Sequence, residues 1–83
     1  MTTNKNFDPV ERPQHYNEGK IECIDAIESA CIGLDGFEGV CTGNAIKYMW
    51  RWKKKAKPAE DVKKSIWYLQ RLLKYLEEQP TNA

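Results

Sequence analysis

The sequence predicts an all-α fold of three helices preceded by an extended N-terminal arm. Apolar residues recur every three or four positions over most of the chain, glycine and proline separate these stretches, and no stretch alternates as a β-strand does. With 83 residues, 41% hydrophobic and 30% charged, the chain has the size and composition of one small globular domain. We expect the helical domain at 20–78, between an arm at 1–19 and a tail at 79–83.

The arm and the first helix meet near Gly19. Pro9 and Pro13 interrupt residues 1–19, which lack periodicity, so this segment is expected to be extended. The first helix is predicted at about 20–32, and Gly33 is the residue expected to end it. Its predicted apolar stripe consists of Ile24, Ile27 and Cys31, with Ile21 and Cys23 alongside.

The second helix is predicted at about 38–57. Its start lies between Phe37 and Thr42, and the earlier start is favoured although it places two glycines inside the helix. Each interior glycine costs about 1 kcal/mol relative to alanine, so Gly43 is expected to allow close approach of another backbone or a ligand. Helical spacing predicts a buried stripe: Ala45, Met49, Trp52 and Ala56. It places polar and basic residues on another face: Asn44, Lys47, Tyr48, Arg51, Lys54 and Lys55.

The third helix is predicted at 58–78, with Pro58 as its first residue and Glu60 and Asp61 in the turn where the helix dipole favours acids. A strong amphipathic repeat runs along it: Val62, Ile66, Leu69, Leu73 and Leu76. Trp67, Leu72 and Tyr75 widen this apolar surface. We therefore expect the helix to pack on two neighbours or to form a subunit interface.

Composition limits the classes of function. Neither a signal peptide nor a run approaching about 18 apolar residues is found, which favours a cytoplasmic protein without a membrane segment. The three cysteines, odd in number and without zinc-site spacing, are expected to be buried free thiols. The net charge of +1 combines an acidic segment at 18–38 with a basic one at 47–57. This balance disfavours nucleic-acid binding, because domains that bind nucleic acids are usually strongly basic.

The basic face of the second helix is the main candidate for a binding site. Lysine and arginine are natural partners of phosphate groups, so Lys47, Arg51 and Lys54 are predicted to hold phosphates. Asn44 and Tyr48 would position a nucleoside by hydrogen bonding and stacking. The alternative is a solvated basic face whose long stems shield aromatic side chains.

Acids and a lone histidine supply the other candidates. Glu22 and Asp25 share a helical face and are the predicted ligands of Mg²⁺, although a solvated acidic face or salt bridges would also explain them. His15 is a candidate for proton transfer or phosphate pairing, with a structural role as the alternative, and Tyr16 beside it is a candidate nucleotide contact. No P-loop motif occurs, so phosphate would need another cradle.

Several motifs occur together in a familiar order. They are P-Q-H-Y from Pro13, I-E-C-I-D-A-I-E at 21–28, G-N-A-I-K-Y-M-W-R-W-K-K-K at 43–55 and E-D-V-K-K-S-I-W-Y-L at 60–69. Over about residues 9–76 the chain resembles a family of small bacteriophage proteins, the DUF3310 or SaV-like family. Because this family includes a nucleotide kinase of phage T7, the resemblance implies a phage origin, a host-cytoplasm location and a nucleotide-related activity.

Three functions follow as hypotheses. The first is a nucleoside monophosphate kinase without a P-loop, in which His15, Lys47 and Arg51 are the catalytic candidates and the site lies between subunits of a homo-oligomer. The second is a non-catalytic nucleotide binder that sequesters a nucleotide or a defence signal. The third is a module that binds a host protein through the aromatic surface of Trp50, Trp67 and Tyr75.

Overall fold

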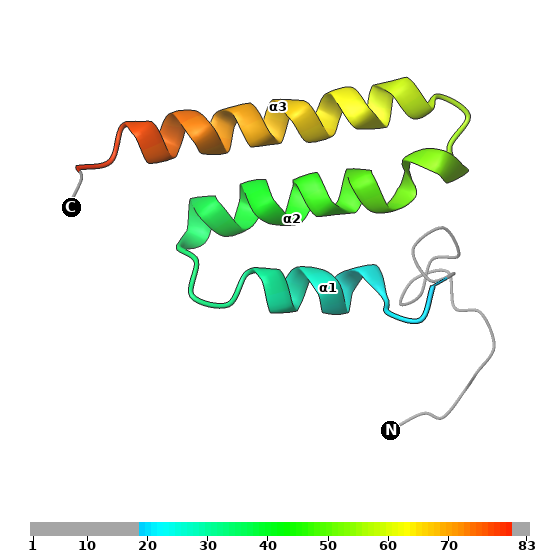
Figure 1. The fold of residues 1–83 in the computed structure, drawn as a ribbon, viewed down its shortest axis with the longest axis horizontal. Coiled ribbons are helices and arrows are strands. Elements are labelled where there is room, and N and C mark those ends of the chain that lie inside the picture. Colours follow the sequence, from blue (N-terminus) through cyan, green and yellow to red (C-terminus); the bar gives the residue numbers. More distant parts are fainter. Residues whose placement is uncertain (1–18, 81–83) are drawn as a thin grey trace.

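The computed structural model describes residues 19–80 as three α-helices joined by short connections. These are α1 (Cys23–Ala30), α2 (Gly36–Arg51) and α3 (Pro58–Glu77), with a 3₁₀ turn, η2 (Trp52–Lys54), after α2. The helices lie side by side and antiparallel with α2 in the middle (Figure 1), and the molecule measures 48 × 34 × 18 Å. The predicted all-α architecture is confirmed, and the described residues contain no strand. The expected arm, apart from Gly19, lies outside the described residues.

The first helix is shorter than expected. Glu22 precedes it in extended conformation, and the turn after it contains Gly33 with a positive φ of 83°. Its buried side differs from the predicted stripe, because Cys23 is buried and Ile27 half-buried while Ile24 is exposed. The reason is that α1 packs mainly against α2, so an eight-residue helix buries a single narrow line of side chains.

A capping box determines where α2 begins. The Asp35 carboxylate accepts a hydrogen bond from the Glu38 amide at 2.8 Å, and the Glu38 side chain accepts one from the Asp35 amide at 3.0 Å. This reciprocal pair satisfies two amides at the helix start. The helix therefore begins at Gly36 rather than at 38, and Thr42 lies within it.

The second helix also ends earlier than the predicted residue 57. After Arg51 the backbone tightens into η2, and Lys55 is already extended. Pro58 disfavours helical backbone at the residue before it, and Lys57 accordingly leaves the helical region, with φ −125° and ψ 73°. The proline then occupies the first turn of α3, as predicted.

Small residues line both sides of α2. Toward α3, Cys41 and Ala45 are buried, and the Ser65 hydroxyl donates a hydrogen bond to the Ala45 carbonyl at 3.0 Å. Toward α1, a Cβ on Gly43 would lie 3.2 Å from the Ile27 Cγ2, so this glycine allows the close approach expected of it. The approaching group is a side chain of α1 rather than a backbone or a ligand.

The predicted buried stripe of α2 is largely wrong. Ala45 is buried, but Met49, Trp52 and Ala56 are exposed. The chain leaves the α-helix at Arg51, which removes Trp52 and Ala56 from the expected helical register. The side of α2 that faces α3 instead carries Cys41, Ala45 and the half-buried Tyr48.

The third helix also packs through a different line of residues. Asp61 and Ser65 are buried and Tyr68, Leu72 and Tyr75 are half-buried, whereas the strongest apolar repeat faces solvent. The exposed fractions along that repeat are 46% for Ile66, 50% for Leu69, 56% for Leu73 and 48% for Leu76. The small Ser65 lets the two backbones approach, and the carboxylate of Asp61 is turned to Arg51. Among the described helices, none has the length and apolar character needed to cross a membrane.

Candidate functional site

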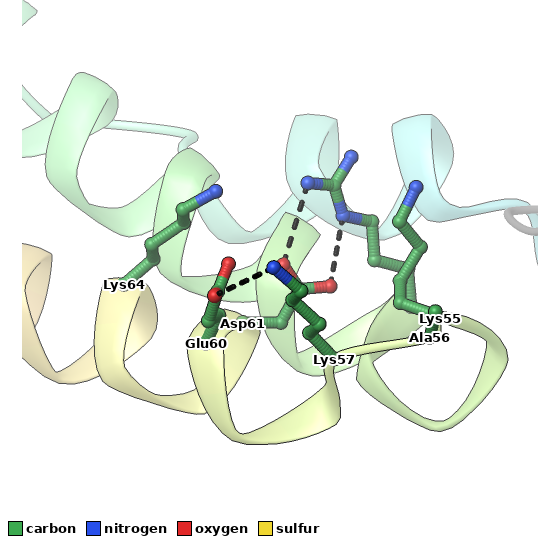
Figure 2. Close-up of a pocket in the computed structure, with 7 residues that line it drawn as sticks. Lys55, Ala56, Lys57, Glu60, Asp61 and Lys64 are labelled. Atoms are coloured by element: carbon green, nitrogen blue, oxygen red, sulfur yellow. Dashed lines mark hydrogen bonds and ion pairs between the residues drawn. The ribbon is translucent and has the colours of Figure 1, made fainter.

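A cationic pocket opens where α2 ends and α3 begins. It has a volume of about 330 Å³ and lies beside the hairpin connection (Figure 2). Basic side chains outnumber acidic ones around it, so the pocket carries an excess of positive charge. The lining residues, which define the hairpin pocket, are Arg51, Lys55, Ala56, Lys57, Glu60, Asp61 and Lys64.

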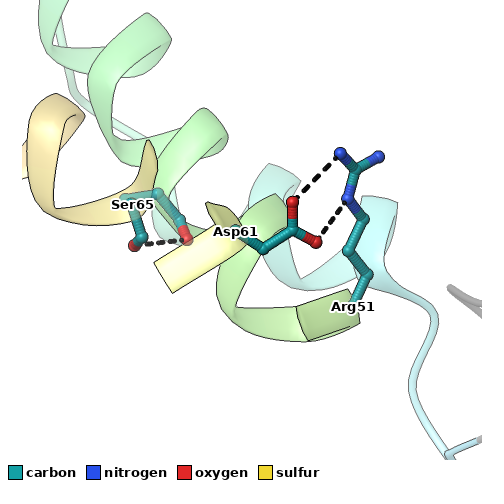
Figure 3. A network of polar contacts seen from close by, with 4 residues as sticks. Arg51, Asp61 and Ser65 are labelled. Carbon is teal, nitrogen blue, oxygen red and sulfur yellow. Dashed lines mark hydrogen bonds and ion pairs between the residues drawn. The ribbon is translucent and has the colours of Figure 1, made fainter. Parts of the chain in front are cut away.

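A largely buried ion pair forms part of the lining of the hairpin pocket. The Arg51 Nε donates to the Asp61 Oδ2 at 3.1 Å and its Nη2 donates to Oδ1 at 3.4 Å (Figure 3). The Arg51 and Asp61 side chains are only 17% and 5% exposed. Such a fork-to-carboxylate contact fixes the plane of the guanidinium. The hydrogen bond from Ser65 to Ala45, one turn further along α3, holds the two helices in register beside it.

The aromatic ring of Tyr48, beside the pocket, makes cation–π contacts with basic side chains from α2 and α3. Three cationic groups lie over it: the Lys47 Nζ at 4.7 Å, the Arg51 Cζ at 4.9 Å and the Lys64 Nζ at 5.4 Å from the ring centroid. Tyr68 stacks with the same ring, with centroids 6.1 Å apart and planes 17° apart. Each cation–π contact contributes about 0.5–1 kcal/mol at an exposed site. Tyr48 thus helps to gather basic groups from α2 and α3 that would otherwise repel one another.

The exposed rim of the pocket is less tightly organised. Lys57 and Glu60 form a surface ion pair with 3.7 Å between Nζ and Oε2. A pair this exposed contributes little to stability because solvent screens it. In Figure 2 the Lys55 and Lys64 side chains extend to the same side of the hairpin, and both residues line the pocket.

The start of α1 lies at the same end of the molecule as the hairpin (Figure 1). Burial raises the pKa of the Cys23 thiol, and the nearby positive charge of Lys47 opposes that shift. Lys47 therefore influences both Tyr48 and the first residue of α1. The predicted metal ligands are also here, with Glu22 preceding the helix and Asp25 in its first turn.

The structure brings together part of the predicted site. Lys47 and Arg51 both lie over the Tyr48 ring, but of these three residues only Arg51 lines the pocket. Asn44 donates to the Val40 carbonyl of its own helix at 2.8 Å and does not line the pocket either. Lys54 lies in η2, also outside the lining. The other two candidates, His15 and Tyr16, fall outside the described residues. Within residues 19–80, no three histidine, cysteine or acidic side chains gather as a metal site.

Sequence reasoning missed the contribution of α3. Lys57, Glu60, Asp61 and Lys64 complete the pocket but were not among the site candidates. A signal was present, because a basic helix end followed at once by a proline and two acids predicts a short connection between antiparallel helices. Such a connection places the acids opposite the preceding basic turn.

A second polar cluster fastens the opposite end of the same helix pair. The Tyr75 hydroxyl donates to the Asp35 Oδ2 at 2.6 Å, and the Tyr75 ring lies 5.0 Å from that of Phe37. The hydroxyl of Tyr75 and the Glu38 amide lower the pKa of Asp35, while the carboxylate raises the pKa of Tyr75. Together with the pair of Arg51 and Asp61, this cluster fixes α2 and α3 at both ends.

The fold and the pocket define a small all-helical protein with a candidate anion-binding site. Over residues 10–70 the chain matches a family described as proteins of unknown function, DUF3310. The chain belongs to the DUF3310 family, which confirms the family predicted from its motifs. Neither the comparison with curated proteins nor that with solved structures gave a match.

Proposed function

We propose that this protein binds a nucleotide through its phosphate groups in the hairpin pocket. The observation that supports this most is the convergence of Arg51, Lys55 and Lys64 on one cavity. Asp61 holds the guanidinium of Arg51 in place, so part of the site is ordered before an anion arrives. Phosphate oxygens would offset the repulsion among these cations, which gives binding its electrostatic driving force.

The activity that fits this site and the family resemblance is phosphoryl transfer between nucleotides. An oxygen of a deoxynucleoside monophosphate attacks the γ-phosphorus of ATP, and a new P–O bond forms. The bond from that phosphorus to the β–γ bridging oxygen breaks, and ADP leaves. This reaction needs positioning and charge neutralisation rather than a covalent nucleophile, and fixed cations supply both.

Magnesium would enter such a reaction with the donor nucleotide. Mg²⁺ commonly takes one or two carboxylates and fills its other positions with water and phosphate oxygens. Glu22 and Asp25, at the start of α1, are the carboxylates proposed to hold it on the protein side. Two acids fit this requirement, and a third protein ligand is not needed.

Paired lysine variants test nucleotide binding. Lys55→Gln removes a charge that lines the pocket, whereas Lys53→Gln removes one from the same basic run outside it. We expect isothermal titration with deoxynucleoside monophosphates and with ATP–Mg²⁺ to show about tenfold weaker binding for Lys55→Gln, since a charge-assisted contact is worth roughly 1.5 kcal/mol. Lys53→Gln should bind as the wild type does. Equal losses for both, or no nucleotide binding by the wild type, would contradict the proposal.

A non-catalytic nucleotide binder is the second candidate, and the size of the pocket favours it. Its volume of about 330 Å³ is at the small end for ligand pockets, so it suits one nucleotide rather than a donor and an acceptor. The variants Glu22→Gln and Asp25→Asn separate the candidates. Loss of turnover with binding retained supports the kinase, while absence of turnover in the wild type together with unchanged binding supports the binder.

A further inference from the structure

The described part of the chain leaves most of its large apolar side chains in contact with solvent. Its buried hydrophobic residues are only Cys23, Cys41 and Ala45, all of them small. Four half-exposed residues follow one another along α3, and we call them the α3 stripe: Ile66, Leu69, Leu73 and Leu76. A helix with so continuous an uncovered apolar stripe requires something to pack against it.

The spacing of the α3 stripe suits another helix. Its members are separated by three, four and three residues, and the half-buried Val62 extends the pattern backward by four. This is the alternation of a helix–helix seam, in which side chains of one helix insert between those of the other. Within the described residues α3 already contacts α2 through a different line, which includes Ser65 and Tyr68.

Charges beside the α3 stripe indicate which helix covers it. Lys63, Gln70 and Glu77 recur at heptad spacing along its outer edge, and all three are exposed. In an antiparallel pair centred near Gln70, Lys63 lies opposite the partner subunit's Glu77, and the reciprocal pair forms at the other end. A parallel pair would set each residue level with its own copy and would not match opposite charges.

We propose that the protein forms a symmetric dimer in which the α3 stripes of two copies pack antiparallel. The interface is isologous, because one two-fold axis relates Lys63 and Glu77 at both ends. Lys64 of the hairpin pocket and Ile66 of the stripe are two positions apart, which places them on nearly opposite sides of α3. The dimer therefore leaves both pockets open on its outer faces, unlike the intersubunit site that the sequence predicted.

A charge exchange tests this arrangement in the full-length chain. Lys63→Glu alone creates acid–acid contacts at both ends of the seam, and Glu77→Lys alone creates base–base contacts. We expect sedimentation velocity to show a dimer for the wild type and about tenfold weaker self-association for each variant. An equimolar mixture of the two variants should form dimers at wild-type strength, because an acid then faces a base at both ends of the mixed pair. The double variant should recover for the same reason.

Glu78→Lys is the matched control for Glu77→Lys, since it makes the same charge change at the next residue, directly after α3 and on the side away from the stripe. It should dimerise as the wild type does. Circular dichroism checks that all variants keep their helix content. A monomeric wild type, as expected if residues 1–18 or another protein cover the stripe, would overturn the proposal. So would single variants that dimerise like Glu78→Lys, or a mixture that fails to recover.

Cross-linking reports the direction of the helices. In a Cys31→Ser background, Gln70→Cys should form a disulfide-linked dimer under mild oxidation, because each Gln70 lies near the two-fold axis. Glu77→Cys should remain unlinked, because its neighbour is Lys63 of the partner subunit. Equal cross-linking of both variants would indicate parallel helices and would overturn the antiparallel seam.

Discussion

At the scale of single residues, Arg51 joins the fold to the candidate site. Its pair with Asp61 joins the end of α2 to the first turn of α3, and it also fixes a guanidinium in the lining of the pocket. Replacing both partners of a buried pair is often tolerated, whereas removing one leaves a charge without compensation. A change of either partner is therefore expected to affect both the contact between the helices and the pocket.

Asp61→Asn tests the structural role of the pair. The variant removes the carboxylate charge that faces the largely buried Arg51 guanidinium at 3.1 Å, so we expect the free energy of unfolding to fall by about 2–3 kcal/mol in urea denaturation. Glu60→Gln breaks only the exposed pair with Lys57, so it should change the free energy of unfolding by less than about 1 kcal/mol. Similar losses of stability in the two variants would show that the pair of Arg51 and Asp61 contributes no more to stability than the exposed pair does.

The contact between Asp35 and Tyr75 predicts a pH dependence. The folded state lowers the pKa of Asp35. The Asp35 carboxylate therefore stabilises the fold at pH values above the ordinary pKa of a carboxyl group, and this contribution is lost as the pH falls through the lowered pKa. The raised pKa of Tyr75 has the opposite sense, so its contribution is present below the ordinary tyrosine pKa and is lost as the pH rises through the raised value.

Tyr75→Phe removes the hydroxyl that contributes most to the shift. We expect the pKa of Asp35, followed through its carboxyl carbon by NMR, to move up toward the usual value in this variant. Tyr68→Phe, which removes a hydroxyl from the ring stacked on Tyr48, should leave Asp35 unchanged. An unchanged titration of Asp35 in Tyr75→Phe would show that the hydrogen bond is not formed in solution.

At the scale of the helices, two glycines of α2 differ in what surrounds them. A Cβ on Gly39 would meet nothing within 4 Å, whereas one on Gly43 would press on Ile27. Gly39→Ala should therefore stabilise the protein by about 0.5–1 kcal/mol through helix propensity. Gly43→Ala should lose that gain in stability, because the Ile27 side chain must give by a few tenths of an ångström to make room. Thermal unfolding of the two variants at equal concentration measures the difference, and an equal gain from both would rule out close packing of α1 at Gly43.

At the same scale, local signals in the sequence predicted the helices better than they predicted how the helices pack. Pro58 and the amphipathic repeat correctly predicted α3, because both are local signals. The early start of α2 depends on Asp35 and Glu38, which form a capping box at the helix start. The side on which α3 packs could not be predicted from its strongest apolar repeat, because Ser65 and Asp61 are buried only through partners on another helix. Lys47, Tyr48 and Arg51 were found for the site because they share one helix, whereas the contribution of α3 required the hairpin.

At the scale of the whole molecule, the small buried core and the exposed α3 stripe imply that stability depends on association. Covering the exposed half of a leucine side chain contributes roughly 1 kcal/mol of stabilising free energy. A symmetric seam covers each residue of the α3 stripe in both copies. We expect the melting temperature of the wild type to rise with protein concentration, since folding and association are then linked. Scanning calorimetry over a hundredfold range of concentration measures this, and a constant melting temperature would contradict the linkage.

At the same scale, the proposed nucleotide site in the hairpin pocket lies at one end of the α2–α3 pair. The most direct test is an NMR titration of the amide resonances with a deoxynucleoside monophosphate and with ATP–Mg²⁺. We predict saturable shifts concentrated between Lys47 and Ser65, with little change near Asp35 and Tyr75 at the other end, and with shifts that weaken as salt screens the cations. Absence of saturable shifts, or shifts centred away from the hairpin, would contradict a nucleotide-phosphate site there.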